Sequence, residues 1–256
     1  MKKFLIFLVC IVVGSAFADQ ITINWLNYDG TTDQTTSCTV GGDVILPTAP
    51  TRYGYTFKGW SPPPYIQLEY IESTGTQYID TGIVPYEYIK IETKIGETTS
   101  LVVNIDGTEA QNGIFGNGYC GARWETINGF RCGFGTDNWM TTNVSQESQN
   151  IIVFEKNNIE YNDQTVSVRL GTNFPNLTMY LFAHNTIKGG VPVVFPSKTM
   201  MYYFKVWDNG TLVANFVPAK RRSDNAIGMY DSVTGTFFEN AGTGTFIAGP
   251  AVGGIH

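Results

Sequence analysis

Residues 119–139 contain side chains that could bind a small ligand. Tryptophan and tyrosine rings stack on the apolar CH faces of pyranose sugars, while neighbouring amide and guanidinium groups bond the hydroxyls. The candidate ligand-binding residues in this glycine-rich segment are Tyr119, Arg123, Trp124, Asn128, Arg131, Asn138 and Trp139. Trp207 is a further aromatic candidate of the same kind. A second interpretation stays open, because aromatic side chains often fill a core instead.

Acidic pairs suited to sugar hydrolysis are not apparent. A retaining glycosidase needs two carboxyl groups about 5 Å apart, which on one face of a strand means acidic residues two or four positions apart. Glu69 and Glu72 are three apart, and Glu155 and Glu160 flank a turn-like segment at 156–158. We interpret both pairs as solvated surface carboxylates. No catalytic residue is predicted, and we expect the protein not to be an enzyme.

A hydrolytic triad would have to use His184, because the only other histidine is the terminal His256. No Gly-x-Ser-x-Gly turn accompanies it, so we expect His184 to be a partly exposed residue at a strand end. No zinc site is predicted either, since the cysteines form no Cys-x-x-Cys pair and the histidines lack ligand spacing.

Cysteine spacing permits one disulfide. Cys120 and Cys132 lie twelve residues apart among short predicted strands, and an oxidising compartment would allow them to pair. Two separate buried thiols are the alternative. Cys38 would remain unpaired.

Residues 1–18 have the pattern of an export signal. Lys2 and Lys3 precede an apolar run over 4–13, and Ala16-Phe17-Ala18 forms a small-residue cleavage site before Asp19. The run is shorter than the roughly 20 residues of a spanning helix, and no other stretch is long and apolar enough. We therefore expect a secreted or cell-surface protein, with the periplasm as an alternative, and no transmembrane segment after cleavage.

The charge balance argues against nucleic acid as a partner. The chain has 16 basic and 22 acidic residues, and cleavage would remove two lysines, so the mature charge is 14 minus 22, or −8. Nucleic-acid binding favours a basic surface. The triplet Lys220-Arg221-Arg222 is expected to be a solvated loop between two strands.

The clearest structural element is a β-hairpin over residues 204–216. Asn209-Gly210 suits a type I′ turn, whose two central residues need positive φ. The predicted register has Asp208 opposite Thr211, Trp207 opposite Leu212, Val206 opposite Val213, Lys205 opposite Ala214 and Tyr203 opposite Phe216. Both faces are largely apolar or aromatic, so we expect this hairpin inside a sheet and not at its edge.

Residues 19–61 form a distinct predicted unit. The segment TVGGDVILPTAPTRYGYTFKGW resembles the internalin-type B-repeat of bacterial surface proteins. The matching residues are Gly41, Gly42, Val44, Leu46, Pro47, Pro50, Arg52, Gly54, Tyr55, Phe57, Gly59 and Trp60. The resemblance implies a small β-grasp-like module. Prolines at 62–64 would form an extended linker after it.

From residue 65 onward the sequence predicts strand after strand and no helix of ten or more residues. The segments EYIESTGTQYIDTGI, MYLFAHN and YYFKVWDNGTLVANFVPAKRRSDNAIGMYDSVTGTFFENAGTGTF resemble a domain of bacterial secreted and surface proteins that is similar to concanavalin A-like and laminin-G-like jelly rolls. The resemblance implies a two-sheet antiparallel jelly-roll β-sandwich over 65–249, followed by a glycine-rich tail at 250–256. The expected fold class is therefore all-β.

The second resemblance implies a domain type without one uniform activity, and we expect a lectin-like function from the aromatic and polar residues at 119–139. Jelly rolls of this type include glucanases, but their Glu-x-Asp-x-x-Glu pattern is absent here. Laminin-G-like domains often hold calcium through loop oxygens, so Ca²⁺ is a possible cofactor; the candidates are Asp106, Asp137, Asn138 and Asp163. We expect carbohydrate recognition or adhesion to a glycan or another component of a host or neighbouring-cell surface. A structural surface domain without a small ligand and a glycoside hydrolase are the alternatives.

Overall fold

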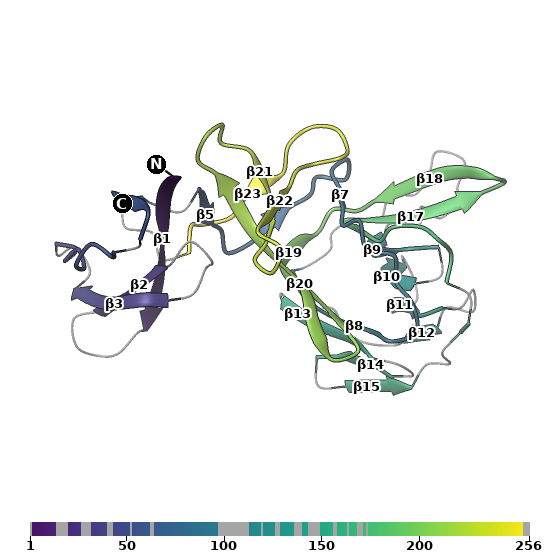
Figure 1. Cartoon of the computed structure of the whole chain (residues 1–256). Coiled ribbons are helices and arrows are strands. Elements are labelled where there is room, and N and C mark those ends of the chain that lie inside the picture. Colours follow the sequence, from purple (N-terminus) through teal and green to yellow (C-terminus); the bar gives the residue numbers. More distant parts are fainter. Residues whose placement is uncertain are drawn as a thin grey trace. The chain divides into compact units, whose positions relative to one another are not determined.

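The computed structural model describes residues 2–13, 20–26, 32–39, 43–51, 53–61, 64–96, 113–118, 120–125, 129–135, 140–142, 149–155, 158–162, 164–167, 171–172 and 174–252. These residues form strands and no helix, so the predicted all-β class is confirmed (Figure 1). None of the described segments is therefore a helix that could cross a membrane. The chain divides into two compact units, Met1–Ile66 with Ala251–His256, and Gln67–Pro250. The division falls within β5 (Tyr65–Gln67), just after the proline-rich stretch at 62–64.

The first unit contains a four-stranded sheet in the order β3-β2-β1-β4. Its strands are β1 (Lys2–Val13), β2 (Gln20–Leu26), β3 (Thr32–Thr39) and β4 (Tyr55–Ser61). Strand β1 is antiparallel to β2 and parallel to β4. Trp25 is buried, and its indole Nε1 donates to Thr36 Oγ1 at 2.8 Å. The predicted export signal thus occupies an interior strand position here, and the β-grasp-like arrangement stays a prediction.

In the second unit, one sheet has the order β12-β11-β10-β9-β16-β7, and β17 joins it beside β9 while pairing with β18. Its strands are β7 (Ile79–Asp80), β9 (Gly113–Asn117), β10 (Cys120–Glu125), β11 (Gly129–Gly133), β12 (Met140–Thr142), β16 (Tyr180–Leu181), β17 (Ala183–Lys188) and β18 (Val191–Pro196). Figure 1 shows the β17–β18 hairpin extending beyond its neighbours.

The other sheet of this unit has the order β15-β14-β13-β8-β19-β20-β21-β22, with β6 pairing both β19 and β23. Its strands that lie entirely within this unit are β6 (Ile71–Glu72), β8 (Ile89–Gly96), β13 (Gln149–Glu155), β14 (Asn158–Tyr161), β15 (Gln164–Ser167), β19 (Met200–Asp208), β20 (Thr211–Arg221), β21 (Ile227–Asp231), β22 (Thr236–Phe238) and β23 (Ile247–Ala248). We refer to it as the long sheet.

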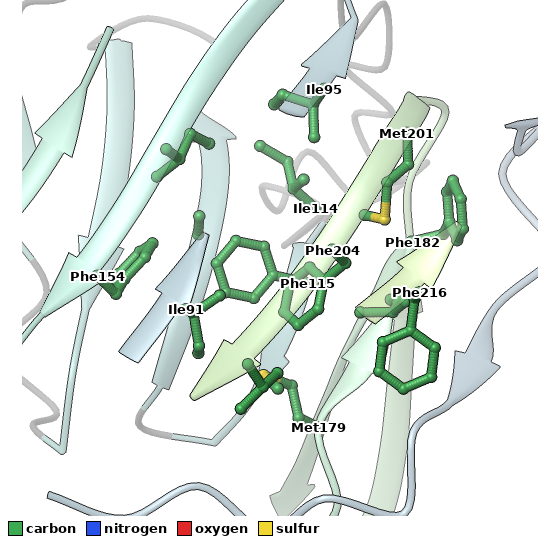
Figure 2. Close-up of a cluster of buried hydrophobic side chains, with 14 of the residues drawn as sticks. Ile91, Ile95, Ile114, Phe115, Phe154, Met179, Phe182, Met201, Phe204 and Phe216 are labelled. Carbon is green, nitrogen blue, oxygen red and sulfur yellow. The ribbon is translucent and has the colours of Figure 1, made fainter. Parts of the chain in front are cut away.

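Phe115 joins the two sheets of the second unit. It lies on β9, and its ring centroid is 5.3 Å from that of Phe154 on β13 and 5.1 Å from that of Phe204 on β19, both in edge-to-face geometry. Figure 2 shows these rings among the buried isoleucine and methionine side chains of both sheets. Since the inner faces of two sheets bury their apolar residues against each other, the second unit is a β-sandwich, as predicted.

The predicted hairpin is present, but part of its predicted register is wrong. Asn209 and Gly210 have φ of 47° and 81°, as a type I′ turn requires, and Trp207 lies opposite Leu212. Beyond that pair a β-bulge shifts the register by one residue. The observed pairs are Val206 with Ala214, Lys205 with Asn215 and Phe204 with Phe216. Strand β19 lies between β8 and β20, so the hairpin is inside the sheet, as expected.

The predicted disulfide between Cys120 and Cys132 is not formed. Both are free, fully buried thiols, and Cys38 is free as well. Ala122, and not Cys120, lies opposite Cys132 in the β10–β11 pair. Cys120 and Cys132 are therefore diagonal neighbours, and such residues lie about 7–8 Å apart, too far for an unstrained bridge. Burial raises the pKa of both thiols to about 12.

Candidate functional site

The structure describes only the backbone of three predicted ligand-binding residues. Arg123 and Trp124 lie on β10 and Arg131 lies on β11, with Arg123 directly opposite Arg131. The other four, Tyr119, Asn128, Asn138 and Trp139, lie outside the described residues. A ligand-binding role for this segment therefore stays a prediction.

A different set of residues forms an open hollow on the long sheet. It has a volume of about 520 Å³, which is within the range of small-molecule sites. Its lining residues are Tyr88, Ile89, Lys90, Glu155, Trp207, Asn209 and Gly210. We call it the Trp207 hollow. It combines two aromatic rings with an amine, a carboxylate and an amide.

Strand alternation places the charged residues of the hollow on the outer face. On β8, Ile89 and Ile91 are buried in the core, whereas Lys90 between them is half-buried. The same period of two gives an outward Trp207 on β19 and an exposed Glu155 on β13. Pairing then aligns the three side chains, because Lys90 lies opposite both Glu155 and Trp207.

Lys90 connects the acidic and aromatic parts of the hollow. Its Nζ lies 3.1 Å from Glu155 Oε2 and 5.5 Å from the centroid of the Trp207 ring. The first contact is an ion pair and the second is within cation–π range. The ion pair orients both side chains, so the remaining donors of Lys90 and acceptors of Glu155 point in defined directions.

Hydrogen bonds connect the β19–β20 turn to the segment before β8. The hydroxyl of Tyr86 donates to Asp208 Oδ1, and this hydrogen bond raises the pKa of Tyr86 above its ordinary value. Asn209 Nδ2 donates to Asp208 Oδ1 at 2.8 Å and to the Tyr86 hydroxyl at 3.2 Å. The Tyr86 ring packs edge-on against Tyr88. This network supports the end of the hollow at which Tyr88 and Asn209 lie.

A second hollow adjoins the first. It has a volume of about 210 Å³ and is lined by Val153, Glu155, Asn158 and Glu160. We call it the Glu160 hollow. Glu155 lies opposite Asn158, and Glu160 lies opposite Val153, so the two glutamates are diagonal neighbours on one face of β13 and β14. Both are exposed, as predicted, but the sequence did not indicate that they line one hollow.

Two other predicted surface features are wrong. His184 is 3% exposed and not partly exposed. It is the second residue of β17 and packs against β9, where a Cβ added to Gly113 would come within 2.3 Å of His184 Cβ. Arg221 is in strand β20 and not in a solvated loop. Its guanidinium lies 2.5 Å from Asp224 and 2.6 Å from Glu239, over the ring of Phe237. Arg221 therefore links the β20–β21 turn to the residue that follows β22.

Within the part of the chain that the structure describes, no three His, Cys, Asp or Glu side chains converge on a point that could hold a metal ion. Three of the predicted calcium candidates, Asp106, Asp137 and Asp163, lie outside that part, as does Asn138.

Comparison with known protein families, characterised proteins and solved structures gives no match to this chain. The resemblances to B-repeats and to laminin-G-like domains rest on their sequence motifs.

The sequence indicates Trp207 as a ligand-binding candidate, but it does not indicate that Glu155, Asn209 and Lys90 lie beside it. Local signals were present: residues 87–95 alternate like a strand, and the Asn209-Gly210 turn fixes the position of Trp207. What the sequence lacks is the order of β13, β8 and β19, which are far apart in the chain. That order alone brings Glu155, Lys90 and Trp207 into one row.

Proposed function

We propose that this protein binds carbohydrate through the Trp207 hollow. The observation that carries the proposal is that two aromatic rings, Trp207 and Tyr88, line one open hollow together with polar side chains. Rings of this kind stack on the CH faces of a sugar, and Lys90, Glu155 and Asn209 supply donors and acceptors for its hydroxyls. The segment 119–139 remains a second candidate surface for the same class of ligand.

A glycan array tests the proposal. We expect the wild-type protein to bind a subset of glycans, and Trp207→Ala to weaken that binding at least about tenfold, the equivalent of one lost stacking contact. Tyr53→Ala is the matched control, since Tyr53 is a fully exposed ring in the first unit. Trp124→Ala and Trp139→Ala test the second surface.

Three results discriminate between the sites and the alternatives. Loss of binding in Trp207→Ala, with the fold retained, supports the Trp207 hollow. Loss of glycan binding only in Trp124→Ala or Trp139→Ala would indicate that the ligand site lies in residues 119–139. No binding by the wild type contradicts the proposal and favours a structural surface domain, which needs only the core.

A glycoside hydrolase is the second candidate, because Glu155 and Glu160 line one hollow. Against it, the Glu155 side chain is 55% exposed and ion-paired, whereas a general acid is usually a carboxyl group held in an apolar pocket. We therefore propose binding without turnover. Release of reducing sugar that disappears in both Glu155→Gln and Glu160→Gln would instead identify an enzyme.

We also propose that the protein is exported. The support is the order of positive residues, apolar run and small residues in 1–18. N-terminal sequencing of protein recovered outside the cytoplasm should begin at Asp19. Cleavage there would also remove β1 from the first unit, so β2 and β4 would lose their common neighbour. An exported chain that retains Met1 would contradict cleavage before Asp19.

A further inference from the structure

One row of side chains crosses four neighbouring strands of the long sheet. Trp207 on β19, Lys90 on β8, Glu155 on β13 and Asn158 on β14 lie successively opposite one another. Adjacent strands are about 4.8 Å apart, so the row is roughly 14 Å long. That length suits a short oligosaccharide better than a single sugar ring.

The two hollows on this row adjoin each other, because Glu155 lines both. The Trp207 hollow supplies the aromatic rings at one end. The Glu160 hollow supplies an amide, a carboxylate and the small apolar side chain of Val153 at the other end. A ligand that stacks on Trp207 and continues along the row would therefore reach Asn158 and Glu160.

The charges along the row disfavour an acidic ligand. Among the described residues that line the two hollows, Lys90 is the one cation and Glu155 and Glu160 are the two carboxylates, which gives a net charge of −1. Lys90 is already paired with Glu155. The next cation on this face, Lys205, lies 3.1 Å from Glu92 and is paired as well. Among these described residues, a uronic acid or sulfate group on the ligand would meet carboxylates and no unpaired cation.

We propose that the two hollows form one groove for an oligosaccharide of at least three sugar residues that carries no acidic groups. The first sugar stacks on Trp207 and Tyr88, and the later sugars cross β8 and β13 toward β14. There Asn158 and Glu160 bond the hydroxyls or an amino group of the last sugar. This inference rests on the proposed function and adds the length and charge class of the ligand.

Calorimetric titration with defined oligosaccharides tests the groove. The probes are cello-, manno- and chito-oligosaccharides of one to six residues, with the chito series in acetylated and free-amine forms, and oligogalacturonates as the acidic series. For at least one non-acidic series, we expect affinity to rise about tenfold or more from one residue to three and then to level off, as extra hydrogen bonds are made. Oligogalacturonates should not bind.

Two variants test the contribution of each end of the groove to binding. Glu160→Gln should weaken binding of the longer oligomers severalfold and leave the monosaccharide unchanged, whereas Trp207→Ala should weaken all lengths. Glu69→Gln is the matched control, because Glu69 is an exposed carboxylate that lines neither hollow.

The outcomes distinguish this inference from the function on which it rests. Binding that depends on Trp207 but has equal affinity for one and six residues contradicts the groove and leaves the proposed function standing. Equal binding of oligogalacturonates contradicts the charge class. Absence of any binding that depends on Trp207 contradicts both the proposed function and the inference.

Discussion

Lys90 and Glu155 lie directly opposite each other on β8 and β13, with 3.1 Å between Lys90 Nζ and Glu155 Oε2. Their side chains are 36% and 55% exposed, so water screens the pair. Exposed ion pairs contribute only about 0–1 kcal/mol to folding. The contact places Lys90 beside the Trp207 ring, where the proposed ligand would lie.

Replacing Lys90 should therefore change stability little. We expect Lys90→Met to change the free energy of unfolding in urea by less than about 1 kcal/mol. Lys205→Met is the matched comparison, because Lys205 makes a similar pair with Glu92 across β19 and β8. A loss of several kcal/mol in Lys90→Met would show that the pair is part of the structural framework.

Phe115 should be among the most sensitive residues of the second unit. It is fully buried and contacts both Phe154 and Phe204. Phe115→Ala is expected to destabilise the unit by about 3–5 kcal/mol, through lost apolar contact and the cavity left between the sheets. Chemical denaturation measures this. Ile187→Ala is the control, since Ile187 is 53% exposed, and an equal loss there would contradict the role assigned to Phe115.

A side chain at Gly210, the second central residue of the turn between β19 and β20, should lower the free energy of unfolding. Gly210 has φ of 81°, and an added Cβ would meet no atom within 4 Å. The cost of Gly210→Ala is therefore backbone strain alone, about 1–2 kcal/mol. Gly118→Ala serves as the control, because Gly118 lacks positive φ and its Cβ would first meet Pro175 Cγ at 3.4 Å. Equal thermal shifts for both variants would contradict this account.

This hairpin also shows how far the sequence can predict the fold. The turn is local, so Asn209-Gly210 predicts it correctly. The bulge after it was missed, although a continuous register would place Phe204 opposite the polar Asn215. The bulge instead pairs Phe204 with Phe216 on the buried face and Lys205 with Asn215 on the other. Burial of both rings is the physical reason that the continuous register fails.

The candidate site was harder to predict because it depends on contacts distant in sequence. Lys90 and Glu155, for example, are 65 residues apart and lie opposite each other on adjacent strands. Alternation can indicate that Lys90, Glu155 and Trp207 face outward, but it carries no information about which strands are neighbours. The disulfide prediction failed for a related reason, since spacing along the chain says nothing about the register of β10 against β11.

The two buried cysteines should make stability fall at alkaline pH. Burial raises the pKa of Cys120 and Cys132 from 9.0 to about 12. Below about pH 7.5 both thiols are almost fully protonated in the folded and unfolded chains, so their environment imposes little pH dependence. Above that pH the unfolded chain loses these protons first, so the free energy of unfolding decreases until the folded pKa is reached. Denaturation at pH 8 and pH 10.5 measures the decrease.

A double Cys120→Ala, Cys132→Ala variant supplies the control for this alkaline effect. Its absolute stability will be lower because it loses buried atoms, but the decrease between the two pH values should be smaller than in the wild type. The remaining decrease would include Tyr203, whose pKa burial and the nearby Glu92 raise to about 12. Mass spectrometry of alkylated protein provides an independent check: both thiols should resist alkylation when folded and react when denatured without reductant. Failure to alkylate them in the denatured, unreduced chain would reveal a disulfide and contradict the register observed between β10 and β11.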